Sequence, residues 1–423
     1  MARFIYSFVL LLLAPVLITY LWVFRGKKQA AYRIHFNERF AYGISSLPKH
    51  ALLFHCASVG EVLAAAPLIK KYKQQHPNDK IIVSTNTPTG RAQIEAIFQE
   101  SVNCVYLPLD FYFTARRFIN TLRPKALCVL ETELWPNLFA HAKANDCPVL
   151  VLNARLSEKS MKGYQRVQPL TNVLMRAVTY LASHNEQDAS RFMKLGLRED
   201  KIRATGSIKF DIQLSEPEQI KARQLKSLLS GRYVWVAGST HPLEHEQVLA
   251  AHKLLLKQYP TALLIIAPRH PEQFEPVASL LATQQFRMTR RSNMQSLEES
   301  QVLLADTLGE LKCLYGASDV AYVGGSLIER GGHNPLEAAA FSVGVLSGPH
   351  TYNFAHIYPE LINASAAITV FDSESLFEQL HTLFNDNDAR MQLGRNAHQV
   401  LMNNQGAINK TLALIDKSLG RNI

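Results

Sequence analysis

The chain opens with an uncharged apolar run and then alternates short aliphatic segments with longer amphipathic ones. The opening run extends from Phe4 to Phe24, and its few polar members are mild. At ~1.5 Å per residue, roughly 21 helical residues extend about 30 Å, the thickness of the hydrocarbon core of a bilayer. Pro15 lies inside the run and is expected to kink it. We therefore expect residues 1–25 to form a membrane-anchor helix.

The charges that flank this run predict its orientation. Arg25, Lys27, Lys28 and Arg33 follow the run, whereas Arg3 alone precedes it. By the positive-inside rule, this asymmetry places the body of the protein in the cytoplasm. A cleaved signal peptide is the alternative, but it would have a shorter apolar region followed by a small-residue cleavage site.

Downstream, the hydrophobic pattern predicts a parallel sheet whose strands are buried on both faces, because the aliphatic runs contain few polar interruptions. Strands are predicted at Ala51–His55, Ile81–Thr85, Cys104–Leu107, Ala126–Leu130, Val149–Asn153 and Thr179–Ala182, with helical patterns at Val62–Gln75, Gly90–Gln99 and Phe111–Leu122.

A second series of the same kind follows the polar segment Gln213–Gly231, which we interpret as a link between domains. Strands are predicted at Tyr233–Gly238, Ala262–Ala267, Gln301–Ala305, Val320–Val323 and Val343–Leu346, with helices near Glu244–Gln258, Glu272–Ala282, Leu308–Tyr315 and Pro335–Phe341. The pattern predicts two α/β domains of similar size, 26–212 and 213–423, with a cleft between them and with the last helices able to pack back on the first domain. Such folds bind ligands at the carboxyl ends of their strands.

Composition narrows the class of partner. The formal net charge is +10 and the sequence pI about 9.3, which favours an acidic partner such as nucleic acid or an anionic membrane surface. The anchor makes lipid headgroups and phosphates the better interpretation. The five cysteines have no CxxC or Cys/His spacing, which indicates buried free thiols and no metal site. Neither GxGxxG nor a P-loop lysine is present, which argues against NAD and against ATP hydrolysis.

Carboxylates and a lysine follow the predicted strands of the first domain. Ser58 and Glu61 have the S-x-x-E spacing of a capping box, while Glu61 could instead face the cleft as a general base. These two interpretations compete for one carboxylate. Glu131 ends a buried strand, where it needs a substrate or a salt bridge to Arg155. Lys209 is either a surface lysine or a point charge for a phosphate or carboxylate.

In the second domain, Arg269 follows a strand and is suited to holding a phosphate. Four glycines lie within the segment from Gly324 to Gly332, and Asn334 and Pro335 are then placed as N-cap and first residue of a helix. We expect free backbone N–H groups and the helix dipole to form an anion site at this turn.

Taken in order, these segments resemble the Kdo (3-deoxy-manno-octulosonic acid) transferases of Gram-negative lipopolysaccharide synthesis. The resemblance is carried by HCASVGEV, TNTPTG, ETELWPN, NARLS with Ser160, GSIKFD, APRHPE, DTLGEL, GGSLIERGGHNPLEAA and GPHTYNF. One mild departure is Asn86, where the family pattern leads us to expect Thr.

The resemblance implies a GT-B glycosyltransferase fold, in which two Rossmann-like domains face each other across a cleft. It also implies that the acceptor lipid binds the N-terminal domain and CMP-Kdo the C-terminal domain, with the enzyme at the cytoplasmic face of the inner membrane. The implied reaction is inverting transfer of Kdo to the lipid A precursor, lipid IVA, with no cofactor, no metal and no nucleic-acid partner. A GT-B enzyme that uses a UDP-sugar on another lipid is the nearest alternative, and a non-catalytic, membrane-tethered scaffold is an alternative of another class.

The resemblance also implies roles for individual residues. The general base falls on Glu61, and stabilisation of the transition state falls on Glu131 and Lys209. The implied contacts to CMP fall on Pro268, Arg269, Gly309, Glu310, Leu311, Asn334, Pro335, Leu336 and Glu337. The phosphate would meet the glycine turn, and the ribose hydroxyls would meet Glu337; alternatively, Glu337 is simply an acidic residue at the start of a helix.

Overall fold

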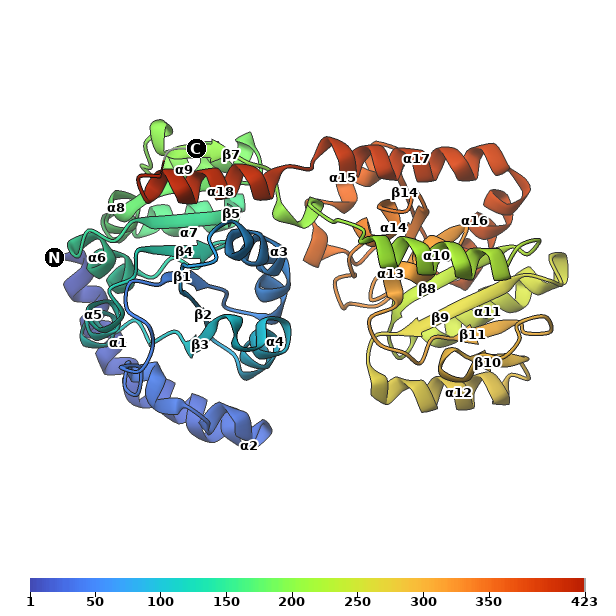
Figure 1. Cartoon of the computed structure of the whole chain (residues 1–423), viewed down its shortest axis with the longest axis horizontal. Coiled ribbons are helices and arrows are strands. Elements are labelled where there is room, and N and C mark those ends of the chain that lie inside the picture. Colours follow the sequence, from blue (N-terminus) through green and yellow to red (C-terminus); the bar gives the residue numbers. More distant parts are fainter. Residues whose placement is uncertain (422–423) are drawn as a thin grey trace. The chain divides into compact units, whose positions relative to one another are not determined.

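The computed structural model describes residues 1–421 and divides into two compact units, each built on one seven-stranded sheet with helices packed on it (Figure 1). The first unit comprises Met1–Asp211 together with the C-terminal segment that begins at Gln405, and the second comprises Ile212–Asn404. Every strand pair in both sheets is parallel. The predicted fold class, two Rossmann-like α/β sheets preceded by an apolar helix, is therefore confirmed.

The first sheet has the strand order β3-β2-β1-β4-β5-β6-β7. Its strands are β1 (Leu52–His55), β2 (Ile81–Thr85), β3 (Asn103–Tyr106), β4 (Ala126–Leu130), β5 (Val149–Ala154), β6 (Val178–Ser183) and β7 (Ile202–Ala204). Its helices are α1 (Ala2–Thr19), α2 (Gly26–Lys28), α3 (Val59–Gln75), α4 (Pro88–Phe98), α5 (Tyr112–Leu122), α6 (Pro136–Ala144), α7 (Glu158–Arg166), α8 (Gln168–Ala177), α9 (Glu186–Lys194) and α18 (Ala407–Ser418).

The second sheet has the strand order β10-β11-β9-β8-β12-β13-β14. Its strands are β8 (Val234–Thr240), β9 (Leu263–Pro268), β10 (Met288–Arg290), β11 (Val302–Leu304), β12 (Val320–Val323), β13 (Gly344–Ser347) and β14 (Ala367–Thr369). Its helices are α10 (Glu216–Leu228), α11 (Glu244–Gln258), α12 (Phe274–Thr283), α13 (Leu311–Ala317), α14 (Leu336–Ala339), α15 (Tyr358–Asn363), α16 (Ser373–Asn385) and α17 (Asn387–Asn403).

Burial explains which strands the hydrophobic pattern predicted. All residues of β1, β2, β4 and β5 are buried, as expected for parallel strands covered on both faces. The pattern did not predict β7, β10 and β14. Each of these has three residues, lies at an edge of its sheet and includes partly or fully exposed side chains, so it produces no apolar run.

The segment interpreted as a link, Gln213–Gly231, instead contains the helix α10, so that prediction is wrong. Ser215 and Glu218 form a capping box at its start. Ala222 and Leu225 are buried on a narrow stripe, and the helix packs against α13. Because so few of its positions are apolar, composition made the helix look like a linker.

The last helix, α18, packs on the first unit, as the prediction allowed for the last helices, and the second unit ends at Asn404. Ile408, Leu412 and Ile415 join the apolar core beneath the first sheet. The carboxylate of Asp211 accepts hydrogen bonds from the backbone N–H groups of Gly406, at 2.5 Å, and Ile408.

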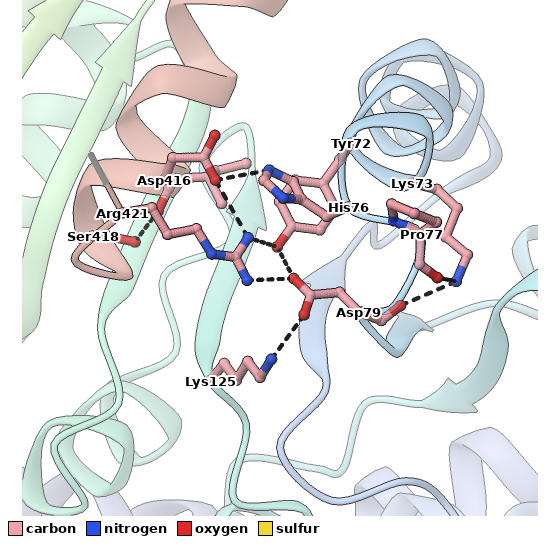
Figure 2. Close-up of polar contacts among 10 residues, drawn as sticks. Tyr72, Lys73, His76, Pro77, Asp79, Lys125, Asp416, Ser418 and Arg421 are labelled. Carbon is pink, nitrogen blue, oxygen red and sulfur yellow. Dashed lines mark hydrogen bonds and ion pairs between the residues drawn. The ribbon is translucent and has the colours of Figure 1, made fainter. Parts of the chain in front are cut away.

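A cluster of charged side chains also attaches the C-terminal segment to the first unit (Figure 2). Arg421 donates to the carboxylate of Asp79 at 2.7 Å, and Lys125 lies 2.8 Å from the same carboxylate. Asp416 lies 2.9 Å from the ring of His76. Burial favours the neutral acid, yet hydrogen bonds from Lys125, Tyr72 and Arg421 hold the pKa of Asp79 below its usual range.

Candidate active-site residues

In the first unit, the three residues predicted to act in catalysis lie at the carboxyl edge of the sheet. Glu61 is in the first turn of α3, which follows β1, and Glu131 directly follows β4, the neighbour of β1. Lys209 lies in the short 3-10 turn Ile208–Phe210. Asn153, near the end of β5, positions this turn because its side-chain oxygen accepts a hydrogen bond from the N–H of Ile208 at 3.0 Å.

Glu61 makes the hydrogen bonds of a helix cap. Its Oε2 accepts from the backbone N–H of Ala57 at 2.9 Å, and its Oε1 accepts from the hydroxyl of Ser58 at 3.1 Å. In return, Oγ of Ser58 accepts from the N–H of Glu61 at 3.4 Å. A carboxylate has about four acceptor sites, so these two bonds leave capacity for a substrate hydroxyl. Capping and proton abstraction therefore need not compete for this side chain.

The environment of Glu61 raises the pKa of its carboxyl group to near neutral pH. Burial raises the pKa of Glu61 to about 7, although the hydrogen bond from Ala57 opposes the rise. The negative charges of Glu131 and Glu133 raise the pKa further. A carboxylate with this pKa is a stronger base than an ordinary glutamate and is still ionised in part at neutral pH.

Glu131 connects two positive charges. Its carboxylate lies 3.2 Å from the guanidinium of Arg155 and 3.7 Å from Nζ of Lys209. The salt bridge to Arg155 that the sequence suggested is thus present, together with the contact to Lys209. The backbone of Glu131 has φ +55°, a left-handed conformation that non-glycine residues adopt at a cost and that is frequent at functional sites.

Lys209 is partly screened from water. Burial lowers the pKa of Lys209, while the neighbouring carboxylate of Glu131 opposes the change. Glu61 also raises it, so the three side chains interact electrostatically although they are distant in the sequence. The structure thus brings the three predicted catalytic residues together.

Two further residues, Glu133 and His55, join this group, and neither was among the predicted catalytic residues. Glu133 accepts a hydrogen bond from the indole of Trp135 at 3.1 Å, and its carboxylate lies 3.8 Å from Nε2 of His55. His55 is fully buried, with Nδ1 3.1 Å from the hydroxyl of Ser84. Both residues lie at strand ends, which was the signal available in the sequence.

In the second unit, the residues predicted to contact CMP occupy three loops at the carboxyl edge of the sheet. Pro268 ends β9 and Arg269 follows it, exposed. Gly309, Glu310 and Leu311 lead from β11 into α13; Asn334, Pro335, Leu336 and Glu337 lead into and through the start of α14. Since β11 and β9 are neighbours in the sheet, the first two loops emerge side by side. Gly309 has φ +80° and nothing near its Cβ position, so that loop has an open surface.

The glycine turn differs from the prediction of free backbone donors. A fully buried glutamate, Glu244, accepts hydrogen bonds from the N–H groups of Gly325 at 2.7 Å, Ser326 at 3.0 Å and Leu327 at 3.1 Å. The N–H of Gly332 bonds to the carbonyl of Gly325 at 2.8 Å. The acceptor for these donors is therefore a side chain of the protein.

Glu244 also accepts from the hydroxyl of Tyr322 at 2.7 Å and from the N–H of His241 at 3.0 Å. The helix expected at Pro335–Phe341 is one turn, Leu336–Ala339, so its dipole contributes little to an anion site. Pro335, not Asn334, is the N-cap of this turn, one residue later than predicted. The side chain of Asn334 accepts from the N–H of Leu336 at 3.1 Å. The N–H of His333 also bonds to a backbone carbonyl, that of Gly324 at 3.2 Å. The prediction of free donors at the turn from Gly331 to Asn334 is therefore wrong for Gly332 and His333.

Three histidine side chains lie close together at this edge of the sheet. Nε2 of His241 lies 2.8 Å from Nε2 of His333, with the rings stacked, and the ring of His270 meets His241 edge-on at 5.6 Å. Burial lowers the pKa of His333 to about 3, and the positive charge of Arg269 adds to the effect. The His241–His333 contact is therefore a hydrogen bond between neutral imidazoles.

Glu337 interacts electrostatically with Arg269, which also affects the pKa of His333. Burial raises the pKa of Glu337, and the positive charges of Lys312 and Arg269 oppose the rise. Glu310, by contrast, is paired with Arg291 at 3.0 Å and accepts from the hydroxyl of Thr307 at 2.5 Å. Arg269 and Glu337 are thus brought within electrostatic reach of each other, while Glu310 has its own partners.

Within residues 1–421, no three His, Cys, Asp or Glu side chains are grouped so that they could hold a metal ion. The five cysteines are free thiols, as predicted, and four of them are buried.

Comparison with known proteins gives one consistent family. Residues 34–212 match the family described as 3-deoxy-D-manno-octulosonic-acid transferase (kdotransferase). Over 428 residues, covering 100% of both chains, the sequence is 39% identical to the 3-deoxy-D-manno-octulosonic acid transferase of Haemophilus influenzae. It is 29% identical over 438 residues to that of Bordetella pertussis, covering 99% of this chain and 100% of the other.

Among solved structures, the UDP-GlcNAc 2-epimerase from Neisseria meningitidis bound to UDP-GlcNAc aligns with a TM-score of 0.58 at 14% identity. The alignment covers 88% of this chain and 100% of the epimerase. At this identity the likeness shows a shared fold of two Rossmann-like domains and carries no information on substrate.

Proposed function

The chain belongs to the family of 3-deoxy-D-manno-octulosonic acid (Kdo) transferases and is a glycosyltransferase, and we propose that it transfers Kdo from CMP-Kdo to the lipid A precursor, lipid IVA, with inversion at the anomeric carbon. The observation that carries the proposal is the group formed by Glu61, Glu131 and Lys209 at the edge of the first sheet, in which the pKa of Glu61 is raised to about 7. A group with this pKa is suited to proton abstraction from a sugar hydroxyl at neutral pH.

In the proposed reaction, Glu61 removes the proton from a sugar hydroxyl of the acceptor. The hydroxyl oxygen forms a bond to the anomeric carbon of Kdo, and the bond from that carbon to the phosphate oxygen of CMP breaks on the opposite face. The proton stays on Glu61, and the electron pair leaves with CMP. The two bonds that Glu61 already accepts hold its carboxylate in position, so little side-chain entropy is lost when substrate binds.

The positive charge of Lys209 is placed to assist this step. As in glycoside hydrolysis, the transition state is expected to have oxocarbenium character at Kdo. We propose that Lys209 interacts with negative charge on Kdo while Glu131 holds its ammonium in position, 3.7 Å away. Arg155 lies on the other side of Glu131, 3.2 Å from the carboxylate, and helps to hold it in place.

For the donor, we propose that CMP binds at the three loops of the second unit: Pro268 and Arg269, Gly309 to Leu311, and Asn334 to Glu337. Arg269 supplies the charge for the phosphate, and the open turn at Gly309 admits the nucleotide. Because the glycine-turn donors are occupied by Glu244, charged side chains contribute more to phosphate binding than the backbone does. CMP is a good leaving group, so the chemistry does not require a metal.

The acceptor and location are proposed from the family and from the N-terminal helix. The helix Ala2–Lys28 is long and apolar enough to cross a membrane, and an 18-residue stretch of it has a mean hydropathy of 2.3. Gly26 is its one buried residue. We propose that the enzyme acts at the cytoplasmic face of the inner membrane, where its lipid acceptor lies.

Nucleotide-dependent thermal protection tests the donor proposal. A ligand that binds the native state alone raises the melting temperature, and the rise grows with the logarithm of its concentration relative to Kd. CMP should protect the second unit more strongly than UDP at equal concentration. Protection by UDP and not by CMP would instead favour a UDP-sugar enzyme, and protection by neither would contradict a nucleotide site.

A further inference from the structure

The N-terminal apolar helix lies along the first unit over its whole length. α1 continues through a π-helical segment, η1 (Tyr20–Arg25), into α2. It packs against α6 and α8 of the first unit. Side chains partly covered by the protein recur every three or four positions, at Arg3, Tyr6, Ser7, Leu10, Ala14, Leu17, Ile18 and Leu21. That spacing marks one face of a helix, so one face is turned toward the body from beginning to end.

The start of the helix is tied to a buried polar group. The hydroxyl of Tyr6 donates to Oδ2 of Asp110 at 3.0 Å. Nδ2 of Asn137 donates to Oγ of Ser7 at 3.0 Å. Asp110 is buried and also accepts from the N–H groups of Asn137, at 2.9 Å, and Leu138, at 2.8 Å, in the first turn of α6. The first turns of the helix are therefore part of a network that the body itself needs.

The other end of the helix is tied to the same unit. Nε of Arg33 donates to the carbonyl oxygen of Trp22 at 3.1 Å, and the ring of Phe36 meets the indole edge-on at 4.8 Å. The guanidinium of Arg25 lies 5.2 Å from the centre of the Tyr32 ring. Ser7 and Trp22 are separated by about 22 Å along a helix axis, so the contacts hold two distant points.

These two attachments are incompatible with a helix that crosses the bilayer. In a crossing helix, Tyr6 and Trp22 would lie near opposite faces of a hydrocarbon core about 30 Å thick. The body could keep its contacts to both residues only if it entered the hydrocarbon core beside the helix. The elements that pack on the helix carry exposed charges, Lys143 on α6 and Arg176 on α8, which hydrocarbon excludes.

The opposite face of the helix is apolar and uncovered. Phe4, Phe8, Leu12 and Val16 recur at helical spacing and are 77%, 55%, 65% and 65% exposed. An apolar face of this length on a water-soluble body needs a partner, because it forms one continuous patch.

The groups that flank this face fit an anionic lipid surface. On α5, Tyr112 and Phe113 are exposed and line a hollow of about 390 Å³ together with Arg116 and Arg117. The guanidinium of Arg3 lies over the ring of Tyr112 at 5.6 Å, so the hollow adjoins the start of the helix. Aromatic rings beside arginines are typical of the level of the lipid headgroups.

We propose that the N-terminal helix lies in the plane of the membrane surface, docked along the first unit, with the Phe4–Phe8–Leu12–Val16 face in the outer acyl layer and the flanking arginines at lipid phosphates. Both ends of the helix then lie on the same side of the bilayer as the body, and the helix does not span it. The inference rests on the membrane location in the proposed function and is independent of the donor and of the catalytic residues.

Cysteine cross-linking in native membranes tests the docked helix. With Ser7→Cys and Asn137→Cys in one chain, oxidation should form an intramolecular disulfide, measured as loss of two thiols in a maleimide mass-tag assay. Phe8→Cys with Asn137→Cys is the matched control, because residue 8 faces away from the body, and it should not cross-link. Failure of the first pair in a chain that folds, judged by an unchanged melting temperature, would overturn the proposal.

A topology measurement avoids any effect of replacing the buried Asn137. A cysteine at the partly exposed residue 2 in the first turn, Ala2→Cys, should react with a membrane-impermeant maleimide only after the inner membrane is opened. Labelling in intact spheroplasts would place residue 2 outside and overturn the proposal. Kdo transfer measured on the same membranes reports on the proposed function separately. If the cysteine pair cross-links and residue 2 is shielded from the maleimide but no Kdo is transferred, the proposed function is contradicted and the helix orientation is still supported.

Discussion

Nζ of Lys209 lies 3.7 Å from Oε1 of Glu131, and this pair joins a segment at the end of the first sheet to the end of β4. Glu131 in turn raises the pKa of Glu61, which begins the helix after β1. A base, a carboxylate and an ammonium are thus coupled although they are separated by up to roughly 150 residues. These residues lie at the carboxyl edge of a parallel sheet, which is where this fold is expected to place its active site.

Glu61→Gln should lower Kdo transfer by ~10²-fold or more, because an amide of the same shape cannot accept the proton. It should keep CMP affinity and the melting temperature close to those of the wild type. Initial rates of transfer, with calorimetry of CMP, measure both. Glu158→Gln, an exposed glutamate that also begins a helix, is the control and should leave the rate unchanged. Near-normal turnover by Glu61→Gln would remove this residue from the mechanism.

The pH dependence should report the raised pKa of Glu61. Because the base must be deprotonated, kcat/KM should rise with pH and level off above a midpoint near 7. Glu133→Gln removes one of the negative charges that raise this pKa, so the midpoint should move to lower pH. Profiles of the two proteins over pH 5–9 provide the comparison. A midpoint that stays in place in Glu133→Gln would contradict the electrostatic coupling.

Glu244→Ala should destabilise the second unit by about 3 kcal/mol or more, because it leaves two buried N–H groups and one partly buried N–H group of the glycine turn without an acceptor. CMP affinity should fall with it, since the turn precedes the donor loop. Denaturant unfolding and calorimetry measure the two effects. Glu246→Ala, an exposed position on the same helix, should change neither.

Glu337→Ala should weaken CMP binding by ~1–3 kcal/mol, the scale of one charged hydrogen bond left unmade. Lipid binding, which is proposed for the first unit, should not change. Calorimetry with CMP distinguishes this role from a structural one: unchanged affinity with a lower melting temperature would show that Glu337 supports only the short helix α14.

Ile415→Ala should destabilise the first unit by ~2–5 kcal/mol, because this fully buried side chain of α18 fills the core beneath the first sheet. CMP affinity should stay unchanged, since α18 belongs to the first unit. Two-domain melting curves with and without CMP would show the loss. A shift confined to the CMP-protected transition would contradict the assignment of α18 to the first unit.

Much of the fold was predictable because its signal is local. The aliphatic runs of β2, β4 and β12 and the helix Glu244–Gln258 occur at the residues that the periodicity indicated. The helix α10 was not, because its apolar stripe is only two buried residues wide in a polar segment.

Candidate residues were predictable where they follow strands, as Glu61, Glu131 and Arg269 do. Glu244 was not, because its partners at the glycine turn are about 80 residues away and nothing local distinguishes it from an ordinary acid in the first turn of a helix. The contact between His241 and His333 was not predictable for the same reason, because the two residues are 92 positions apart in the sequence. Hydrogen bonds between remote segments require the tertiary structure.

Transfer of labelled Kdo from CMP-Kdo to lipid IVA tests the central claim most directly. The purified chain in detergent should form one Kdo–lipid bond for each CMP released, and Glu61→Gln should form product at least ~10²-fold more slowly at saturating donor and acceptor. Absence of Kdo–lipid product from wild-type protein that still binds CMP and lipid, or an equal rate from Glu61→Gln, would contradict the account.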